Sequence, residues 1–464
     1  MEKSRKFNDK LGFWSIVLLA INSIIGSGIF LTPGSVVKRV GSKALMVYLI
    51  AATLAAIIAI SFAAAAKYVT KSGAAYAYAK AAFGDNVGFY IGILRYFSAS
   101  VAWGVMAVGV IKSTIAIFGG QADNPVNITL GFLLLMSIIT MINLLGQKFL
   151  KLVMNIATVG KIAALILIII AGASLLLKSG TSLDLTVVDQ ITQHGQKIVP
   201  NITLTNFVMA VVAAFFVFTG FESIASGSDD MQKPEKNLPK AIPLAILIIA
   251  IIYIGVITVA ILLNPRALMT TKQVVAISAV FNNKILRAII LVGALVSMLG
   301  VNIASSFNAP RILEAMARQQ QLSQSLTKRT EHNFPARTFL ISVALAILVP
   351  LAFQYNLTNL ITLSAIVRFL GYLVVPLAVI AFYFDKSKEA VLPANKNVWT
   401  DLIAPIFSII LVGFLLIKYD WQLQFGIVDN GKVIGVNWSA IAVMLFGLVI
   451  LPLAMFLISR KDRK

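Results

Sequence analysis

The chain has 464 residues, of which 59% are hydrophobic and only 12% are charged, and its mean hydropathy is +0.91. A soluble chain of this length needs a more polar surface, so these values exclude the soluble classes and predict a polytopic membrane protein. The chain has no cysteine, which excludes disulfides and thiol chemistry, and its formal charge of +21 has to be explained by where the basic residues lie.

Apolar runs of about 20 residues recur along the chain, and this is the length that a helix needs to cross a bilayer. We predict twelve transmembrane helices, at residues 11–33, 44–66, 87–111, 126–145, 152–177, 205–226, 241–263, 285–307, 337–353, 357–384, 400–417 and 437–458. An even number of spans places both termini on one side of the membrane. Lys and Arg are more abundant in the connections of that side, so the positive-inside rule places both termini in the cytoplasm.

The predicted organisation has no soluble domain. It consists of a cytoplasmic tail at 1–10, a core of ten helices at 11–384, a cytoplasmic loop at 385–399, two further helices at 400–458 and a cytoplasmic tail at 459–464. Helices eleven and twelve show no special polar content. Because the basic residues lie in the connections, we expect them to meet anionic lipid headgroups, and we expect no nucleic-acid partner.

The first predicted helix is interrupted by Gly26-Ser27-Gly28. Two glycines remove side-chain bulk, so a ligand can approach the backbone closely. The free amides of the half-helix that follows form an anion site, strengthened by the helix dipole, and a carboxylate suits it. The alternative interpretation is close helix–helix packing, which small residues also permit.

The sixth predicted helix is interrupted near Gly220. A broken helix in lipid must hand its freed backbone groups to other partners. Unwound carbonyls from Phe216 to Thr219 can accept hydrogen bonds from an ammonium group. Phe216 and Phe218 can close over a ligand and exclude water; packing in the core or against lipid is the alternative for these rings. Five spans separate the two breaks, which predicts a five-plus-five inverted repeat with a zwitterion site at mid-membrane.

Four ionisable residues lie within predicted helices and away from the first turn, where each is costly unless it is used or paired. The apolar surroundings of Glu222 favour its protonated form, which makes it a candidate proton acceptor; a permanently neutral or salt-bridged carboxyl is the alternative. Lys161 is a candidate to replace a sodium ion or to release a proton, with snorkelling as the alternative. Arg368 can pair with Glu222 or meet an acidic group of a ligand, and Arg95 is expected to snorkel to the cytoplasmic interface.

Four motifs in order resemble the amino acid–polyamine–organocation superfamily. They are Gly26-Ser27-Gly28-Ile29-Phe30, Phe218-Thr219-Gly220-Phe221-Glu222-Ser223, Pro234-Glu235-Lys236-Asn237-Leu238-Pro239-Lys240-Ala241-Ile242-Pro243 and Asn308-Ala309-Pro310-Arg311-Ile312-Leu313-Glu314-Ala315-Met316-Ala317-Arg318. The resemblance implies broken helices 1 and 6, alternating access, and a substrate carboxylate at Ser27 and Gly28. It also implies that the carbonyls of Ile24, Phe216 and Thr219 bind the amino group.

The sixth-helix motif is especially similar to that of the bacterial arginine/agmatine antiporter. The resemblance implies a gating role for the aromatic ring at Phe216, proton sensing by Glu222, and an ammonium group at Lys161 in the place of a sodium ion. This chain has Phe216 where the antiporter has Trp, and the arginine at Arg368 argues against a strongly cationic substrate.

We therefore expect an amino acid transporter of the cytoplasmic membrane, with proton symport as the first mechanism and amino acid/amine exchange as the second. The expected substrate-binding residues are Ile24, Ser27, Gly28, Phe216, Thr219, Gly220, Phe307 and Arg368, and the expected proton-coupling residues are Glu222 and Lys161. Neither a metal nor a cofactor is expected, because both histidines lie in polar connections. A membrane-embedded enzyme and a non-transporting nutrient sensor are remote alternatives, and monomer and homodimer both fit the pattern.

Overall fold

The computed structural model is built almost entirely of helices, which satisfy their own backbone hydrogen bonds in lipid. It describes residues 11–71, 73–144, 147–180, 184–225, 231–271, 273–330, 334–429 and 432–462. In these ranges ten helices are long and apolar enough to cross a membrane, and two shorter apolar helices lie at the sixth and ninth predicted positions. The prediction of an all-α polytopic membrane protein with about twelve spans is confirmed.

The first half of the chain ends at the second break. Its helices are α2 (Phe13–Ile24), α3 (Gly28–Leu31), α4 (Pro33–Val40), α5 (Ala44–Tyr68), α6 (Ala75–Phe83), α7 (Asp85–Ile117), α8 (Pro125–Leu144), α9 (Gln147–Ser179) and α10 (Leu204–Phe216). Its short elements are the 3-10 helices η1 (Gly41–Lys43) and η2 (Leu185–Gln190) and the antiparallel strands β1 (Thr192–Gln193) and β2 (Gln196–Lys197). The first predicted helix is thus α2 and α3, with the break at residues 25–27 between them.

The second half begins after the break that follows α10. Its longer helices are α11 (Pro234–Leu263), α14 (Lys284–Arg318), α15 (Ala336–Ala352), α16 (Leu357–Tyr383), α17 (Ala404–Lys418), α19 (Trp438–Leu445) and α20 (Leu451–Asp462). Its short elements are η3 (Phe221–Ser223), α12 (Pro265–Thr270), α13 (Ala276–Ala279), η5 (Gln324–Thr327), the π-helices η6 (Trp399–Ile403) and η7 (Phe446–Ile450), α18 (Trp421–Phe425), β3 (Gly426–Asp429) and β4 (Lys432–Val436).

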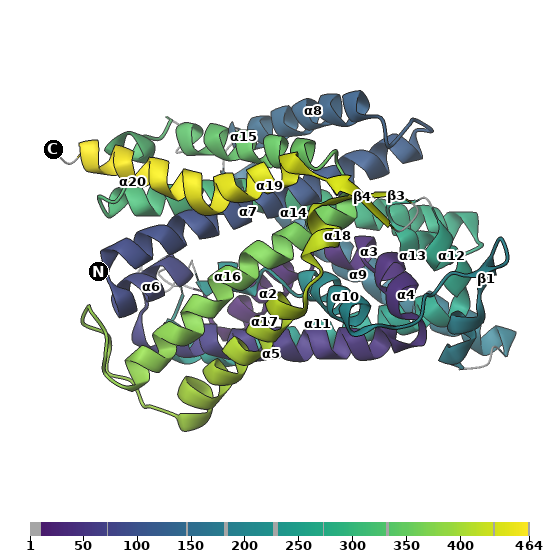
Figure 1. Cartoon of the computed structure of the whole chain (residues 1–464), viewed down its shortest axis with the longest axis horizontal. Helices are drawn as coiled ribbons and strands as arrows, with labels where there is room; N and C mark the ends of the chain where they lie inside the picture. Colours follow the sequence, from purple (N-terminus) through teal and green to yellow (C-terminus); the bar gives the residue numbers. More distant parts are fainter. Residues whose placement is uncertain are drawn as a thin grey trace.

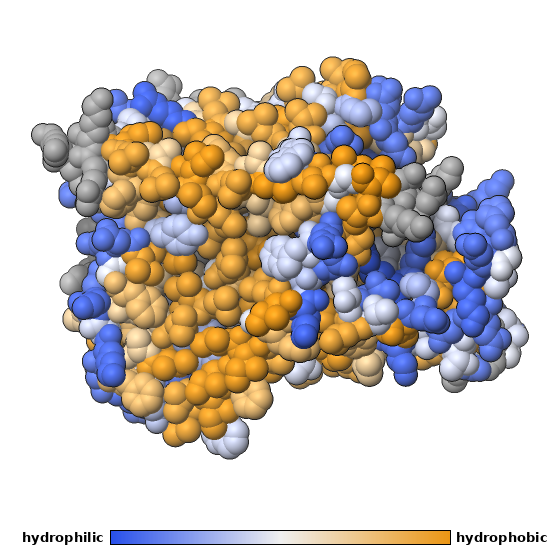
Figure 2. All heavy atoms as spheres, in the orientation of Figure 1, coloured by the Kyte–Doolittle hydropathy of each residue, from blue (hydrophilic) through white to orange (hydrophobic). Residues whose placement is uncertain are grey.

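The connections gather at the two ends of the helix bundle. The β1 hairpin, α12, α13 and the β3–β4 hairpin lie at one end, and α6, the loop after α16 and the end of α20 lie at the other (Figure 1). Apolar side chains cover the middle of the face shown in Figure 2, whereas hydrophilic side chains collect at both ends. An apolar belt between two polar ends is the surface that a bilayer requires.

Burial separates the helices of the core from those at the periphery. In α7, 72% of the most apolar stretch is buried, against 28% in α8 and 17% in the last span, which runs from Trp438 to Ser459. α7 is therefore a central helix, and most of its apolar stretch faces protein. The large exposed apolar side chains of α8 and of the last span, such as Leu134 and Leu453, face the lipid.

A buried ion pair attaches the eleventh predicted helix to the core. Asp401, in η6, is fully buried and accepts hydrogen bonds from Lys67 Nζ at 2.5 Å, from the Tyr68 hydroxyl at 2.7 Å and from the Thr400 hydroxyl at 2.6 Å. The expectation that helices eleven and twelve lack special polar content is wrong. The π-helical turn carries the buried carboxylate at the start of α17, where Lys67 of α5 reaches it.

We expect Asp401→Asn to lower the free energy of unfolding by about 3 kcal/mol, because breaking a buried pair leaves the ammonium group of Lys67 uncompensated. Thermal unfolding in detergent measures this loss. The matched control is Asp123→Asn, because the Asp123 side chain also pairs with a lysine but is 95% exposed, and surface pairs contribute about 0–1 kcal/mol. Equal stability of the two variants would contradict the role of Asp401.

Candidate functional site

The break between α2 and α3 contains several backbone and side-chain polar groups without hydrogen-bond partners. Among the described residues, the amides of 26–29 donate no backbone hydrogen bond, and the carbonyl of Ile24 accepts none. The hydroxyl of Ser27 is also buried without a hydrogen-bond partner. A buried polar group without a partner is costly, so a ligand that supplies partners binds favourably here. The break therefore presents amides and a hydroxyl, which donate to a carboxylate, next to a free carbonyl.

The break after α10 is a tight irregular turn. The amides of Val217, Phe218 and Thr219 donate to carbonyls only three residues back, and Gly220 adopts φ +117°. In this part of the described chain, the carbonyls of residues 217–219 accept no hydrogen bond, so they are free to accept one from a ligand. The carbonyl of Phe216 differs from the expectation, because the amide and the hydroxyl of Thr219 both donate to it, the hydroxyl at 2.7 Å.

The two breaks lie against each other. A Cβ atom on Gly28 would come within 3.0 Å of Val217 Cα and 3.3 Å of the Phe216 ring. A Cβ on Gly220 would overlap the carbonyl oxygen of Ser23, at the end of α2. Glycine is thus required at position 220, whereas a side chain at position 28 would crowd Val217 and Phe216. The structure brings the two sets of unpaired groups together. Phe216 lies directly over the first break.

Lys161 of α9 is joined to the first break. It is 2% exposed, and its Nζ donates hydrogen bonds to the carbonyls of Asn22 at 2.5 Å and Ile25 at 2.8 Å. Thr158, one turn earlier, donates its hydroxyl to Asn22 Oδ1 at 2.8 Å. The alternative that Lys161 snorkels to the interface is wrong, because these contacts hold its ammonium group against the C-terminal end of α2, where the helix dipole favours a cation.

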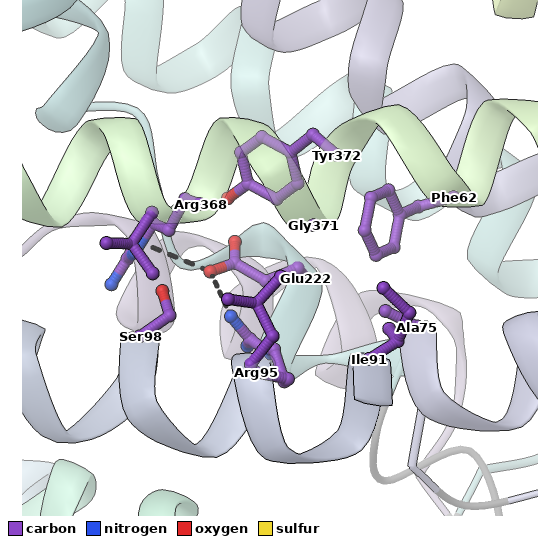
Figure 3. A pocket seen from close by; sticks show the side chains of 11 residues that line it. Phe62, Ala75, Ile91, Arg95, Ser98, Glu222, Arg368, Gly371 and Tyr372 are labelled. Carbon is purple, nitrogen blue, oxygen red and sulfur yellow. Dashed lines mark hydrogen bonds and ion pairs between the residues drawn. The ribbon is translucent and has the colours of Figure 1, made fainter. Parts of the chain in front are cut away.

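Glu222 lies at the centre of a second charged group, close to the second break (Figure 3). Its Oε2 accepts a hydrogen bond from the amide of Gly220 at 2.8 Å, and its Oε1 accepts one from Arg95 Nη1 at 2.9 Å. Arg368 Nη1 lies 3.4 Å from the same Oε1. Glu222 was interpreted either as a proton acceptor or as a neutral or salt-bridged structural carboxyl. These contacts favour the salt-bridged carboxylate, because two guanidinium groups stabilise its charged form.

The sequence predicted a partner of Arg368 correctly but not the position of Arg95. Arg368 pairs with Glu222, which is one of its two predicted partners. The expectation that Arg95 snorkels is wrong: its side chain is only 9% exposed and it forms an ion pair inside the core. α7 is longer than the predicted helix at 87–111 and lies at the centre of the bundle. Arg95 therefore lies deeper in the core than its distance from the start of the predicted helix indicates.

Two further expectations concern aromatic residues. Phe218 is expected to help close over a ligand, and its ring packs against that of Tyr253 of α11, with the ring centroids 5.3 Å apart. The side chain of Phe307 lies outside the described residues. Sequence reasoning missed Ser98 and Tyr372, which line the cavity beside Glu222. Each follows an arginine by one helical turn, and this spacing is the signal that could have found them.

Comparison with known proteins identifies the family of this chain. A family model described as amino acid permease matches residues 11–455. The chain belongs to the amino acid permease family. It is 35% identical over 459 residues to an uncharacterized transporter of Mycobacterium tuberculosis, with 97% of this chain and 94% of the relative covered.

Two relatives from Bacillus subtilis have more specific names. The branched-chain amino acid permease is 28% identical over 452 residues, covering 90% of each chain. The serine/threonine exchanger is 27% identical over 412 residues, covering 87% of this chain and 88% of the relative. The resemblance to the amino acid–polyamine–organocation superfamily is confirmed, and the protein is a multi-pass membrane protein of a transporter family.

Proposed function

We propose that this permease moves amino acids across the cytoplasmic membrane by alternating access, with both termini in the cytoplasm. The observation that carries the proposal is the contact of two helix breaks whose unpaired groups complement a zwitterion. The amides of residues 26–29 and the hydroxyl of Ser27 donate to the α-carboxylate. The carbonyls of Ile24 and of residues 217–219 accept from the α-amino group.

Alternating access follows from how these groups are arranged. Phe216 and Gly28 touch across the breaks, so a substrate that enters must separate them, and its own contacts offset that cost. The carboxylate and ammonium are common to all amino acids, so the breaks set the class of substrate. Gly220, Arg368 and Phe307 are proposed to set the choice of side chain.

Proton symport is the proposed mechanism, with Lys161 and Glu222 as the proton-linked pair. The ammonium group of Lys161 lies where a cation would bind between the carbonyls of Asn22 and Ile25. Loss of its proton would leave a neutral amine, whose hydrogen bonds to these two carbonyls are weaker than those of an ammonium group. The first break would then be held less firmly, which couples protonation to the shape of the site. Glu222 would take up a proton only after its contact with Arg95 or Arg368 is broken, so we assign the first proton step to Lys161.

Amino acid/amine exchange is the second candidate. The similarity to a protein named as a serine/threonine exchanger favours it over the remaining alternatives. An exchanger has the same site, and it differs from a symporter in that the empty carrier does not return across the membrane.

Uptake into proteoliposomes tests the proposal. Each of the twenty amino acids and common decarboxylation products is offered first with an imposed proton gradient and an empty lumen, then with no gradient and a preloaded lumen. Gradient-driven accumulation in empty vesicles would establish symport. Uptake only into preloaded vesicles would establish exchange, and binding without uptake in either arm would indicate a sensor.

We expect Glu222→Gln to flatten the dependence of uptake on pH while leaving some substrate binding, because it removes a titrating carboxyl but keeps its shape. It should also lower the free energy of unfolding by about 3–5 kcal/mol, since two buried guanidinium groups lose their carboxylate. Uptake measured across a range of external pH gives the first result and thermal unfolding gives the second.

The control for this variant is Glu389→Gln, which removes a carboxyl whose side chain is 32% exposed in the loop after α16. It should leave the pH dependence unchanged and, because Glu389 pairs with Lys71 and Lys80 near the surface, should lower the free energy of unfolding by at most about 1 kcal/mol. An unchanged pH dependence in the Glu222 variant would remove Glu222 from the proton-coupling pair and leave it a structural ion-pair partner.

A further inference from the structure

The charged group around Glu222 is not balanced. Among the described residues, its ion pairs join one carboxylate, that of Glu222, to two guanidinium groups, those of Arg95 and Arg368. All three side chains are at most 9% exposed. One positive charge is therefore left over inside the protein, where an uncompensated charge is costly.

Unused hydrogen-bond donors mark where the surplus charge lies. Nε and Nη1 of Arg368 have no hydrogen-bond partner, although Nη1 is close enough to Glu222 for ion pairing. Nε of Arg95 and the hydroxyl of Ser98 are also buried without a partner. Glu222 in contrast uses both of its oxygens. The donors outnumber the acceptors, and what is missing is a second anionic group.

The elements around this group form one small cavity. Arg95 and Ser98 come from one face of α7, one turn apart, and Arg368 and Tyr372 from one face of α16, also one turn apart. Figure 3 shows the side chains of the two helices converging on Glu222 from opposite sides, with Ser98 below Arg368. The cavity between them has a volume of about 10 Å³, which is room for about one water molecule.

The cavity adjoins the substrate breaks. The amide of Gly220 donates to Glu222, so the charged group begins two residues beyond the second break. Phe221, next in the chain, stacks on Tyr372 with ring centroids 5.6 Å apart, which fixes α16 against the break. A substrate held between the breaks has this group beside it. Separation of the breaks would move Gly220 and, through its hydrogen bond, the carboxylate of Glu222, which would enlarge the cavity.

We propose that the surplus guanidinium of Arg368, with the hydroxyl of Ser98, binds the side-chain carboxylate of an acidic amino acid. An acidic amino acid carries one net negative charge, which balances the one net positive charge of the group. A carboxylate also supplies the acceptors that Arg368 lacks, in the planar geometry that guanidinium recognises. Glu222 remains paired with Arg95, while Arg368 leaves Glu222 and pairs with the carboxylate of the substrate. This inference rests on the proposed transport of amino acids.

Two pairs of nearly isosteric substrates test the inference. Wild-type proteoliposomes are offered glutamate or glutamine, and aspartate or asparagine, at equal concentration. We expect the acids to be taken up in preference to the amides. Arg368→Gln should lower the acid-to-amide uptake ratio by about tenfold to a hundredfold, as loss of a charged hydrogen bond requires. Arg266→Gln, at an exposed position of α12, removes the same charge away from the cavity and should leave the ratio unchanged.

Ser98→Ala provides a second variant in case Arg368→Gln does not fold, as judged by gel filtration and thermal unfolding. It removes one donor and no charge. Because a hydrogen bond to a carboxylate is stronger than one to an amide oxygen, it should weaken acid uptake several-fold and amide uptake less. An acid-to-amide ratio that Ser98→Ala does not alter would overturn the role of this hydroxyl, and a ratio that Arg368→Gln does not alter would overturn the inference.

The outcomes separate the inference from the proposed function. Uptake of neutral amino acids in preference to acids overturns the inference and leaves amino acid transport intact. If thermal stability in that case falls when chloride is replaced by gluconate, the surplus charge belongs to a bound chloride. Absence of uptake for all twenty amino acids, by folded wild-type protein in both vesicle arrangements, overturns the proposed function and the inference with it.

Discussion

Lys161→Ala is expected to abolish gradient-driven accumulation while exchange between preloaded vesicles continues. The ammonium group of Lys161 donates to two carbonyls at the end of α2, and each hydrogen bond to a charged group is worth about 1.5–3 kcal/mol. Without them the first break no longer responds to a proton, so accumulation should fall by about tenfold or more. Uptake into empty vesicles with and without an imposed proton gradient measures the effect.

The control for this variant lies on the same helix. Lys178 is in the last turn of α9 and is exposed, so Lys178→Ala removes an equal charge without touching the break. It should accumulate substrate like the wild type. Full accumulation by Lys161→Ala would reduce Lys161 to a structural cap of α2 and would assign proton coupling elsewhere.

Gly220→Ala is expected to eliminate transport and to lower thermal stability. Gly220 has φ +117°, a region that other residues adopt at a cost of about 1–3 kcal/mol. In addition, the added methyl group would overlap the carbonyl oxygen of Ser23, so the two breaks could not come together. The backbone must shift at the point where Gly220 also donates to Glu222.

Substrate-dependent stabilisation in a thermal-unfolding assay, together with uptake, measures this second effect. Gly413→Ala is the matched control, because Gly413 lies within α17 and a Cβ there meets no atom within 4 Å. The control should keep both uptake and stability. Normal uptake by Gly220→Ala would show that the contact of the two breaks is dispensable and would remove the central support of the proposed site.

Local sequence predicted the features whose cause is local. A run of apolar residues forms a transmembrane helix wherever it lies in the fold, because lipid forces its backbone groups to pair internally. The interruptions at residues 25–27 and 217–220 were also visible, since glycine next to small or polar residues breaks such a run. Lys161 and Glu222 stood out for a similar reason: an ionisable residue in an apolar run needs a partner.

The identity of those partners was not visible in the sequence. Glu222 and Arg95 are 127 residues apart, and Lys67 and Asp401 are 334 apart. The faces of an apolar helix are similar in composition, so the sequence does not show which face contacts a given neighbour. The rotation and depth of the packed helix decide which residues form pairs. Arg95 was therefore placed at the interface when it lies in the core.

The sequence by itself thus determined the class of protein, the number of spans, the two broken helices and the need for partners around each buried charge. Only the tertiary structure decided that the breaks touch at Gly28 and Gly220, that Lys161 reaches the first break, and that Arg95 and Arg368 share Glu222. The physical reason is that secondary structure in lipid depends on neighbours along the chain, whereas ion pairs and close backbone contacts depend on how helices pack.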